Sequence, residues 1–139
     1  MKLLIRAWCE AAALATPIRH AVFVVEQHVP VALELDELDS SAWHALAYLK
    51  GVCVGTARLF ATDNEGHIGR MAVLAPYRRQ GVGSALLSTL VQYAQNQSLY
   101  PIYLNAQLAA IPFYAKFNFI PEATIFYDAG IAHRTMRLG

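Results

Sequence analysis

The pattern of apolar and polar residues divides this chain into short strands and helices. Three runs rich in strand-forming residues follow one another at positions 43–50, 52–61 and 67–74. The turn-forming segments Lys50-Gly51 and Asp63-Asn64-Glu65-Gly66 separate them. Strand-like runs joined by such short turns predict an antiparallel meander in the middle of the chain.

The first third of the chain has a weaker pattern. Residues 3–8 are typical of a strand. Thr16 and Pro17 are typical of a helix start, with Thr16 as the N-cap and Pro17 at the first helical position, so we expect a helix over 18–27. Residues 28–41 show no clear period, and we expect a loop or an irregular helix there.

After Pro76 the apolar residues recur at helical rather than strand spacing. They are Val82, Leu86, Leu87, Leu90 and Tyr93. A strand at 100–105, a short helix at 109–117 and two last strands at 124–127 and 133–138 are expected to follow. Because no repeat or linker interrupts the chain, the pattern predicts one α+β domain with a mixed sheet over residues 1–139.

Composition narrows the class of protein. Hydrophobic residues make up 56% of the chain and charged residues 15%, which excludes a disordered protein. This composition leaves apolar surface that either a homodimer interface or a ligand cleft would cover. The formal net charge is only +1, so a nucleic-acid partner is not expected.

The cysteines and the N-terminus indicate where the protein works. Cys9 and Cys53 lie in apolar sequence without metal-type spacing, so we expect two buried thiols in a reducing compartment and no metal site. The apolar N-terminal stretch is interrupted by Arg6 and Glu10 too early for a signal peptide, and no apolar run reaches membrane-spanning length. We therefore predict a cytoplasmic protein with no membrane partner.

The strongest chemical signal is a glycine-rich turn between a strand and an amphipathic helix, Arg78-Arg79-Gln80-Gly81-Val82-Gly83-Ser84. A helix start exposes backbone N–H groups without intrahelical partners, and the helix dipole adds positive potential there. Glycine lets the backbone approach a pyrophosphate closely, and the two arginines can bind phosphate oxygens. From the residues alone, a plain helix start with two solvated arginines is the alternative. The nucleotide P-loop and the G-x-G-x-x-G motif are both absent.

The spacing of this turn matches a known family. The run Val73-x-x-x-Tyr77-Arg78-x-x-Gly81-x-Gly83 resembles the acetyl-CoA motif of the GNAT superfamily of N-acetyltransferases, in which R/Q-x-x-G-x-G/A follows a strand that ends in valine. A second run resembles that superfamily's other coenzyme A motif: Leu104-Asn105-Ala106-Gln107-x-x-Ala110-x-x-Phe113-Tyr114-x-x-Phe117-x-Phe119. Asn118 replaces the usual glycine there, and we expect it to adopt the left-handed backbone conformation that asparagine tolerates.

The flanking segments are similar to the ElaA-like branch of bacterial GNAT proteins. They are Arg19-x-x-Val22-Phe23-Val24-Val25-Glu26-Gln27-x-x-Pro30, then Glu34-x-Asp36-x-x-Asp39 with His44, and finally Gly130-Ile131-x-His133-x-x-Met136. The resemblance covers nearly the whole chain in order. It implies a mixed, mainly antiparallel sheet of about six or seven strands flanked by about four helices.

The resemblance also implies a coenzyme A site in the gap between the strand that ends at Val73 and the strand at 100–105. The residues implied to bind the cofactor are Met71, Ala72, Val73, Arg78, Arg79, Gln80, Gly81, Val82, Gly83, Ser84, Asn105, Phe113 and Tyr114. Backbone groups of residues 71–73 would pair with the pantetheine arm, and one N–H would polarise the thioester carbonyl. For the side chains of Met71 and Val73 the alternative is packing in the core, and for Asn105 it is capping a strand end.

By the same resemblance Tyr114 would donate a proton to the departing thiolate, with a core tyrosine as the structural alternative. The attacking amine needs a base or a water chain, and Glu26 is the first candidate. The alternatives for Glu26 are a surface acid or a partner of Arg19. The other candidates are Glu34, Asp36, Asp39 and His44, which we also predict to contact the acceptor. The acids would supply negative potential for an ammonium group; a solvated acidic loop is the alternative.

These features predict an enzyme that moves an acetyl group from acetyl-CoA to a primary amine on a small molecule, peptide or protein, by direct attack in a ternary complex and without a metal. A non-catalytic acyl-CoA-binding module on the same fold is the alternative, because a fold does not determine a function.

Overall fold

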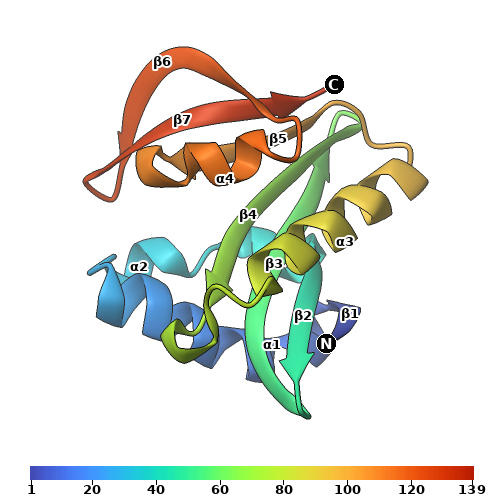
Figure 1. Cartoon of the computed structure of the whole chain (residues 1–139), viewed down its shortest axis with the longest axis vertical. Helices are drawn as coiled ribbons and strands as arrows, with labels where there is room; N and C mark the ends of the chain where they lie inside the picture. Colours follow the sequence, from blue (N-terminus) through green and yellow to red (C-terminus); the bar gives the residue numbers. More distant parts are fainter.

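The computed structural model describes residues 1–139 as a seven-stranded sheet with helices on both faces (Figure 1). The strands are β1 (Lys2–Ala7), β2 (Trp43–Leu49), β3 (Val52–Thr62), β4 (Glu65–Val73), β5 (Ile102–Gln107), β6 (Ile120–Asp128) and β7 (Ile131–Leu138). The α-helices are α1 (Trp8–Arg19), α2 (Val31–Glu34), α3 (Val82–Asn96) and α4 (Ile111–Ala115). Short turns of other helix types are η1 (His20–Glu26), η2 (Glu37–Ser41), η3 (Ala75–Tyr77) and η4 (Leu108–Ala110).

The strands lie in the order β1-β2-β3-β4-β5-β7-β6. Neighbouring strands run antiparallel except β4 and β5, which are parallel. This confirms the α+β class and the mixed, mainly antiparallel sheet. The β2–β3–β4 meander is also confirmed, and Lys50 and Gly51 turn its first hairpin with positive φ angles of 50° and 79°.

The predicted start of the first helix is wrong. The helix α1 begins at Trp8, directly after β1, and Pro17 lies inside it. Ala11, Ala15 and Ile18 form its buried face, while Pro17 is exposed. The apolar face therefore continues past the proline, whose missing N–H removes one helical hydrogen bond on the solvent side. The extension also places Cys9 on the exposed surface, contrary to the expected buried thiol.

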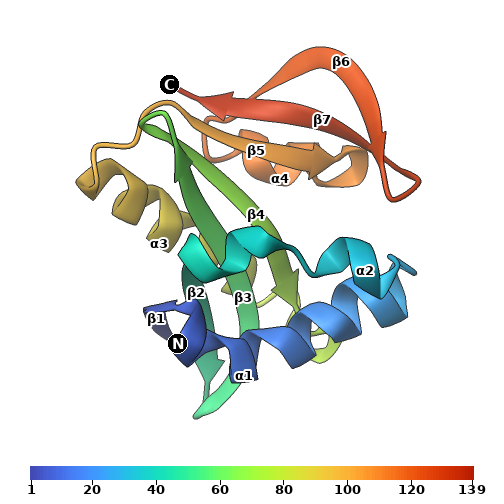
Figure 2. The same ribbon diagram turned by 180° about the vertical axis from the view of Figure 1, so that it is seen from behind.

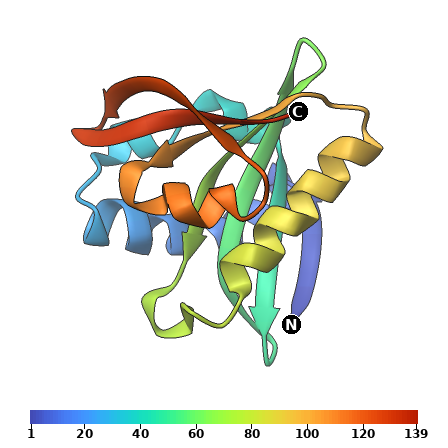
Figure 3. The ribbon, with the colours of Figure 1, turned by 45° about the horizontal axis from the view of Figure 1, so that its top comes forward.

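Helices cover the two faces of the sheet unequally. On one face α3 packs Leu86, Leu87 and Leu90 onto the central strands, and the shorter α4 lies against β5 and β6 (Figures 1 and 3). On the other face α1 crosses β2, β3 and β4, with η2 beside it (Figure 2). Most of the buried apolar residues lie in the core on the α3 face.

The parallel pair β4–β5 is short. Only Gly66, His67 and Ile68 pair with β5, and their partners are Ile102, Tyr103 and Leu104. Beyond Ile68 the two strands are no longer hydrogen-bonded to each other, although β4 continues to Val73 and β5 to Gln107. Half of β4 therefore has an unpaired edge in the middle of the sheet, as expected for the strand that ends at Val73.

Candidate active site

A cleft of about 920 Å³ lies where β4 and β5 separate. Nearly all the residues predicted to bind the cofactor line it: Met71, Ala72, Val73, Arg78, Arg79, Gly81, Val82, Gly83, Ser84, Asn105, Phe113 and Tyr114. Of that set, Gln80 alone lies outside; its amide donates to the carbonyl oxygen of Pro76 at 3.4 Å. The structure thus brings together two sequence segments that are separated by the whole of α3.

The glycine-rich turn has the backbone conformation of an anion site. Arg79 and Gly81 both have positive φ, 62° and 81°, and the helix α3 begins one residue later at Val82. The first helical bond runs from the N–H of Ala85 to the carbonyl of Gly81, so the N–H groups before it are free for a ligand. At Gly83 a Cβ would meet only the ring of Phe113, at 3.6 Å, which leaves the helix start open to close approach.

Arg78 and Glu26 form a bidentate ion pair beside this turn. Arg78 donates to both carboxylate oxygens of Glu26 at 2.7 Å and, through Nε, to the carbonyl oxygen of Val73 at 2.9 Å. The hydrogen bond to Arg78 lowers the pKa of Glu26, which also lies outside the cleft. A carboxylate held in this way is a weak proton acceptor, so the structure does not support Glu26 as the base.

A β-bulge changes the direction of β4 at the cleft. Thr56 pairs with Ala72 and Arg58 with Gly69, so Arg70 and Met71 together oppose the single residue between them on β3. Arg70 has a positive φ of 49°. Bulges of this kind re-aim backbone and side chains near active sites. Here the bulge lies on the unpaired stretch of β4.

Arg70 is a site residue that the sequence analysis missed. Its guanidinium donates to the carbonyl oxygens of Leu33 and Glu34, both at 3.2 Å, and to the carboxylate of Asp36 at 3.0 Å. These three bonds attach the bulge to the segment at 33–36. Gly69 was the available signal, because a glycine inside a strand often marks a bulge.

Tyr114 projects from α4 toward the bulge. Its hydroxyl lies 3.9 Å from the sulfur of Met71, and its ring packs edge-on against Phe113 and Phe119. Burial raises the pKa of the Tyr114 phenol to about 12. The hydroxyl therefore keeps its proton at neutral pH and can serve as a donor. The neighbouring Asn118 has a φ of 70°, which confirms the expected left-handed conformation.

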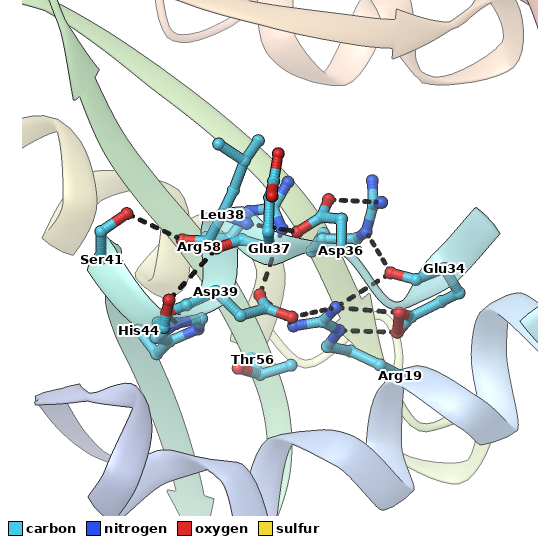
Figure 4. Close-up of polar contacts among 12 residues, drawn as sticks. Arg19, Glu34, Asp36, Glu37, Leu38, Asp39, Ser41, His44, Thr56 and Arg58 are labelled. Atoms are coloured by element: carbon cyan, nitrogen blue, oxygen red, sulfur yellow. Dashed lines mark hydrogen bonds and ion pairs between the residues drawn. The ribbon is translucent and has the colours of Figure 1, made fainter. Parts of the chain in front are cut away.

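The predicted acceptor acids belong to a buried ion-pair network (Figure 4). Arg19 is 1% exposed and donates to the carboxylates of both Glu34, at 2.6 and 2.8 Å, and Asp39, at 2.8 and 3.0 Å. Arg58 bonds Asp39 at 3.1 Å and Asp36 at 2.7 Å. With Arg70, three arginines face three carboxylates, so the charges balance.

This network corrects the expectation of negative potential at 34–39. Glu34 and Asp39 are buried and already paired, and Asp39 does not line the cleft. His44 is also buried outside the cleft, with its Nε2 on the carbonyl oxygen of Asp39 at 2.9 Å; burial lowers its pKa. We therefore no longer expect Asp39 or His44 to touch an acceptor. Contact by the partly exposed Asp36, which lines the cleft, stays a prediction.

Stacked rings line the cleft on the face away from α3. Phe60, His67 and Tyr103 are cross-strand neighbours on β3, β4 and β5, and their ring centroids are 4.9 and 5.6 Å apart. Both faces of the His67 ring are therefore covered, and its Nε2 is buried without a hydrogen-bond partner. Sequence analysis missed this row, because pairing register decides which rings meet.

The far ends of β5 and β7 complete the cleft. Gln107 donates to the side-chain oxygen of Gln27 at 2.9 Å and so connects β5 to the end of η1. Thr135 donates to Asn105 at 2.9 Å, and His133 on β7 pairs with Gln107. Asn105, Gln107 and His133 all line the cleft.

Comparisons with known proteins agree with this geometry. The sequence model of the acetyltransferase (GNAT) family matches residues 7–119. The uncharacterized N-acetyltransferase YjcF of Bacillus subtilis (strain 168) is 37% identical over 120 residues, which cover 86% of each chain. Protein ElaA of Escherichia coli (strain K12) is 35% identical over 121 residues, which cover 84% of this chain and 79% of ElaA.

Solved structures of similar proteins have the same fold. An acyl-CoA N-acyltransferase from Pseudomonas aeruginosa superposes with a TM-score of 0.89 at 26% identity, covering 99% of both chains. Escherichia coli ElaA superposes with a TM-score of 0.87 at 27% identity, covering 98% of this chain and 97% of ElaA.

None of the helices in this chain has the length and apolar character needed to cross a bilayer.

Proposed function

This chain belongs to the acetyltransferase (GNAT) family, and we propose that it moves an acetyl group from acetyl-CoA to a primary amine by direct attack within a ternary complex. The observation that carries the proposal is a single cleft containing both a phosphate-type helix start and an unpaired strand edge, with a protonated tyrosine between them. Each of these three parts matches one part of the cofactor: pyrophosphate, pantetheine arm and thioester.

The residues present fit coenzyme A. Free N–H groups at the start of α3, with Arg79 close by, suit a pyrophosphate. The unpaired edge of β4 at 69–73 offers backbone donors and acceptors to the amides of the pantetheine arm. Arg78 is already bonded to Glu26 and Val73, so we assign it the role of holding the turn in place rather than that of binding phosphate.

The chemistry assigned to this chain has two parts. A backbone N–H at the bulge, next to Met71, stabilises negative charge on the thioester oxygen as the amine attacks. The Tyr114 hydroxyl donates its proton to the sulfur as the carbon–sulfur bond breaks. Because burial holds the pKa of this phenol near 12, the proton is available whenever the thiolate forms.

The acceptor end of the cleft is proposed to be the face that carries Phe60, His67 and Tyr103, with Asp36 at its rim. Because Asp36 is paired with arginines, this end of the cleft is expected to recognise the acceptor by shape and ring contact rather than by net charge. Two unpaired cysteines suit a reducing cytoplasmic setting, which is part of the same proposal.

The test combines binding and turnover. Coenzyme A at about a hundred times its dissociation constant should stabilise the fold by about 2.7 kcal/mol, seen as a thermal shift. Acetyl-CoA should then release a free thiol when phenethylamine, spermidine, lysine or a peptide with a free N-terminus is added. Thermal stabilisation without thiol release from any of these amines would indicate a non-catalytic binding module and overturn the enzyme assignment.

A further inference from the structure

His133 is held in one orientation and one tautomer at the cleft wall. Its Nδ1 lies 2.7 Å from the carbonyl oxygen of Ile131, and its ring stacks on Phe126 with centroids 5.7 Å apart and planes 20° apart. A carbonyl oxygen can only accept, so Nδ1 carries the hydrogen in this contact. The lone pair of the neutral ring therefore lies on Nε2, which has no partner in the protein and is not sealed from solvent.

His133 and Tyr114 approach the cleft from opposite faces of the sheet. Leu104 pairs with Met136 in the core beneath α3, so the alternate pair Gln107–His133 projects from the other face. Tyr114 comes from α4, which lies on the α3 side. The amine enters and the thiolate leaves at different positions on the carbon under attack. A base on one side of the gap can therefore serve the amine while an acid on the other side serves the thiolate.

The other titratable groups near the acceptor face are less suited to act as the base. Glu26 and His44 lie outside the cleft, and the Nε2 of His67 is buried between rings. Glu34 is bonded to Arg19, and Asp36 is bonded to two arginines. Asp128 lines the cleft, but a carboxylate is a much weaker base toward an ammonium group than an imidazole is.

We propose that His133 is the general base of this site: its Nε2 takes a proton from the ammonium group of the acceptor before the amine attacks. The inference rests on the proposed function above. One acceptor proton passes to His133 and then to solvent. The nitrogen loses a second proton as the amide forms, and this replaces the one that Tyr114 gives to sulfur. The products are the amide and the free thiol.

His133 has no charged partner within the sheet. The strand neighbours on β5 and β6 are the uncharged Gln107 and Phe126. Asp128, at the end of the same hairpin, also lines the cleft. The remaining charged residues that line the cleft are Glu34, Asp36, Arg58 and Arg70 on the opposite wall and Arg78, Arg79 and Lys116 toward the glycine turn.

The test uses His133→Asn, because the asparagine amide can still donate to the Ile131 carbonyl but has no group in place of Nε2. The probe is the fastest primary alkylamine of the panel above, and the comparison substrate is methoxyamine, whose nitrogen is unprotonated at pH 7. His20→Asn, an exposed histidine outside the cleft, is the matched control. Circular dichroism and the coenzyme A thermal shift verify the fold of each variant.

We expect His133→Asn to lower kcat/KM for the alkylamine about a hundredfold at pH 7 and to leave methoxyamine nearly unchanged. The difference in kcat/KM between wild type and variant should become smaller as pH rises, because the alkylamine then loses its proton without a base. Wild-type kcat/KM for the alkylamine should level off above the pH range in which imidazoles lose their proton, whereas that of the variant should keep rising toward the amine's own pKa. Equal losses for both amines, or an unchanged pH profile, would overturn the role of His133. No turnover by wild-type protein would instead overturn the proposed function.

Discussion

Replacing Arg19 with methionine should destabilise the protein severely, because it leaves two buried carboxylates without their main partner. Glu34 and Asp39 are 5% and 3% exposed, and Arg19 supplies four of their side-chain contacts. Breaking a buried ion pair from one side costs about 3–5 kcal/mol, against a total stability of about 5–15 kcal/mol for an ordinary domain. For a chain of this size that predicts a fall in Tm of about 10–20 °C.

The measurement is urea and thermal unfolding followed by circular dichroism, with Arg6→Met as the matched control. Arg6 makes an ion pair with Glu10 in which the side chains are 42% and 64% exposed, and such pairs contribute at most about 1 kcal/mol. Adding Glu34→Gln to Arg19→Met should recover part of the loss by removing one unpaired charge. Equal destabilisation by Arg19→Met and Arg6→Met would refute the reasoning.

The same network predicts how stability depends on pH. Burial alone would raise the pKa of Asp39, but its bonds to Arg19 and Arg58 lower it overall. A carboxyl whose folded pKa is depressed stabilises the fold above its ordinary pKa, about 3.9, and loses this contribution as pH falls through the folded value. Wild-type stability should therefore fall more steeply below about pH 4 than that of the Arg19→Met variant.

Three further substitutions separate binding from chemistry. Gly83→Val should abolish coenzyme A binding in calorimetry with little change in Tm, because its side chain occupies the ligand side of the helix start; normal binding would disprove the pyrophosphate assignment. Tyr114→Phe should lower kcat about a hundredfold while the dissociation constant of coenzyme A changes little, and unchanged turnover would make Tyr114 a packing residue. Glu26→Gln should raise the KM for acetyl-CoA by loosening Arg78, with kcat for the amine nearly kept; a collapse of kcat alone would restore Glu26 as a catalytic group.

Sequence patterns predicted the strands and the start of α3 well, because both depend on local signals. Turn residues marked the meander, and the glycine spacing marked the start of α3. The errors came from long-range packing. Pro17 is typical of a helix start, but in the structure the helix α1 begins earlier and its apolar face extends on both sides of Pro17.

The side of the cleft that carries residues 34–36 and His133 could not be predicted in the same way. A run of acids looks solvated in sequence, and here Arg19, Arg58 and Arg70 approach it from distant elements to neutralise it. The free lone pair of His133 likewise depends on a carbonyl two residues earlier and on a ring from the neighbouring strand. Such contacts are decided by register and side-chain direction, which a single sequence does not specify.

The early separation of β4 from β5 also bears on self-association. An unpaired strand edge is a ready template for another polypeptide, and proteins usually shorten, charge or cover such edges at the rim of a sheet. Here the open stretch of β4 after Ile68 lies between two strands of one continuous sheet, with α4 on one face and η1 on the other. The position of the gap thus keeps this unpaired edge away from the rim of the sheet, where edge-to-edge aggregation begins.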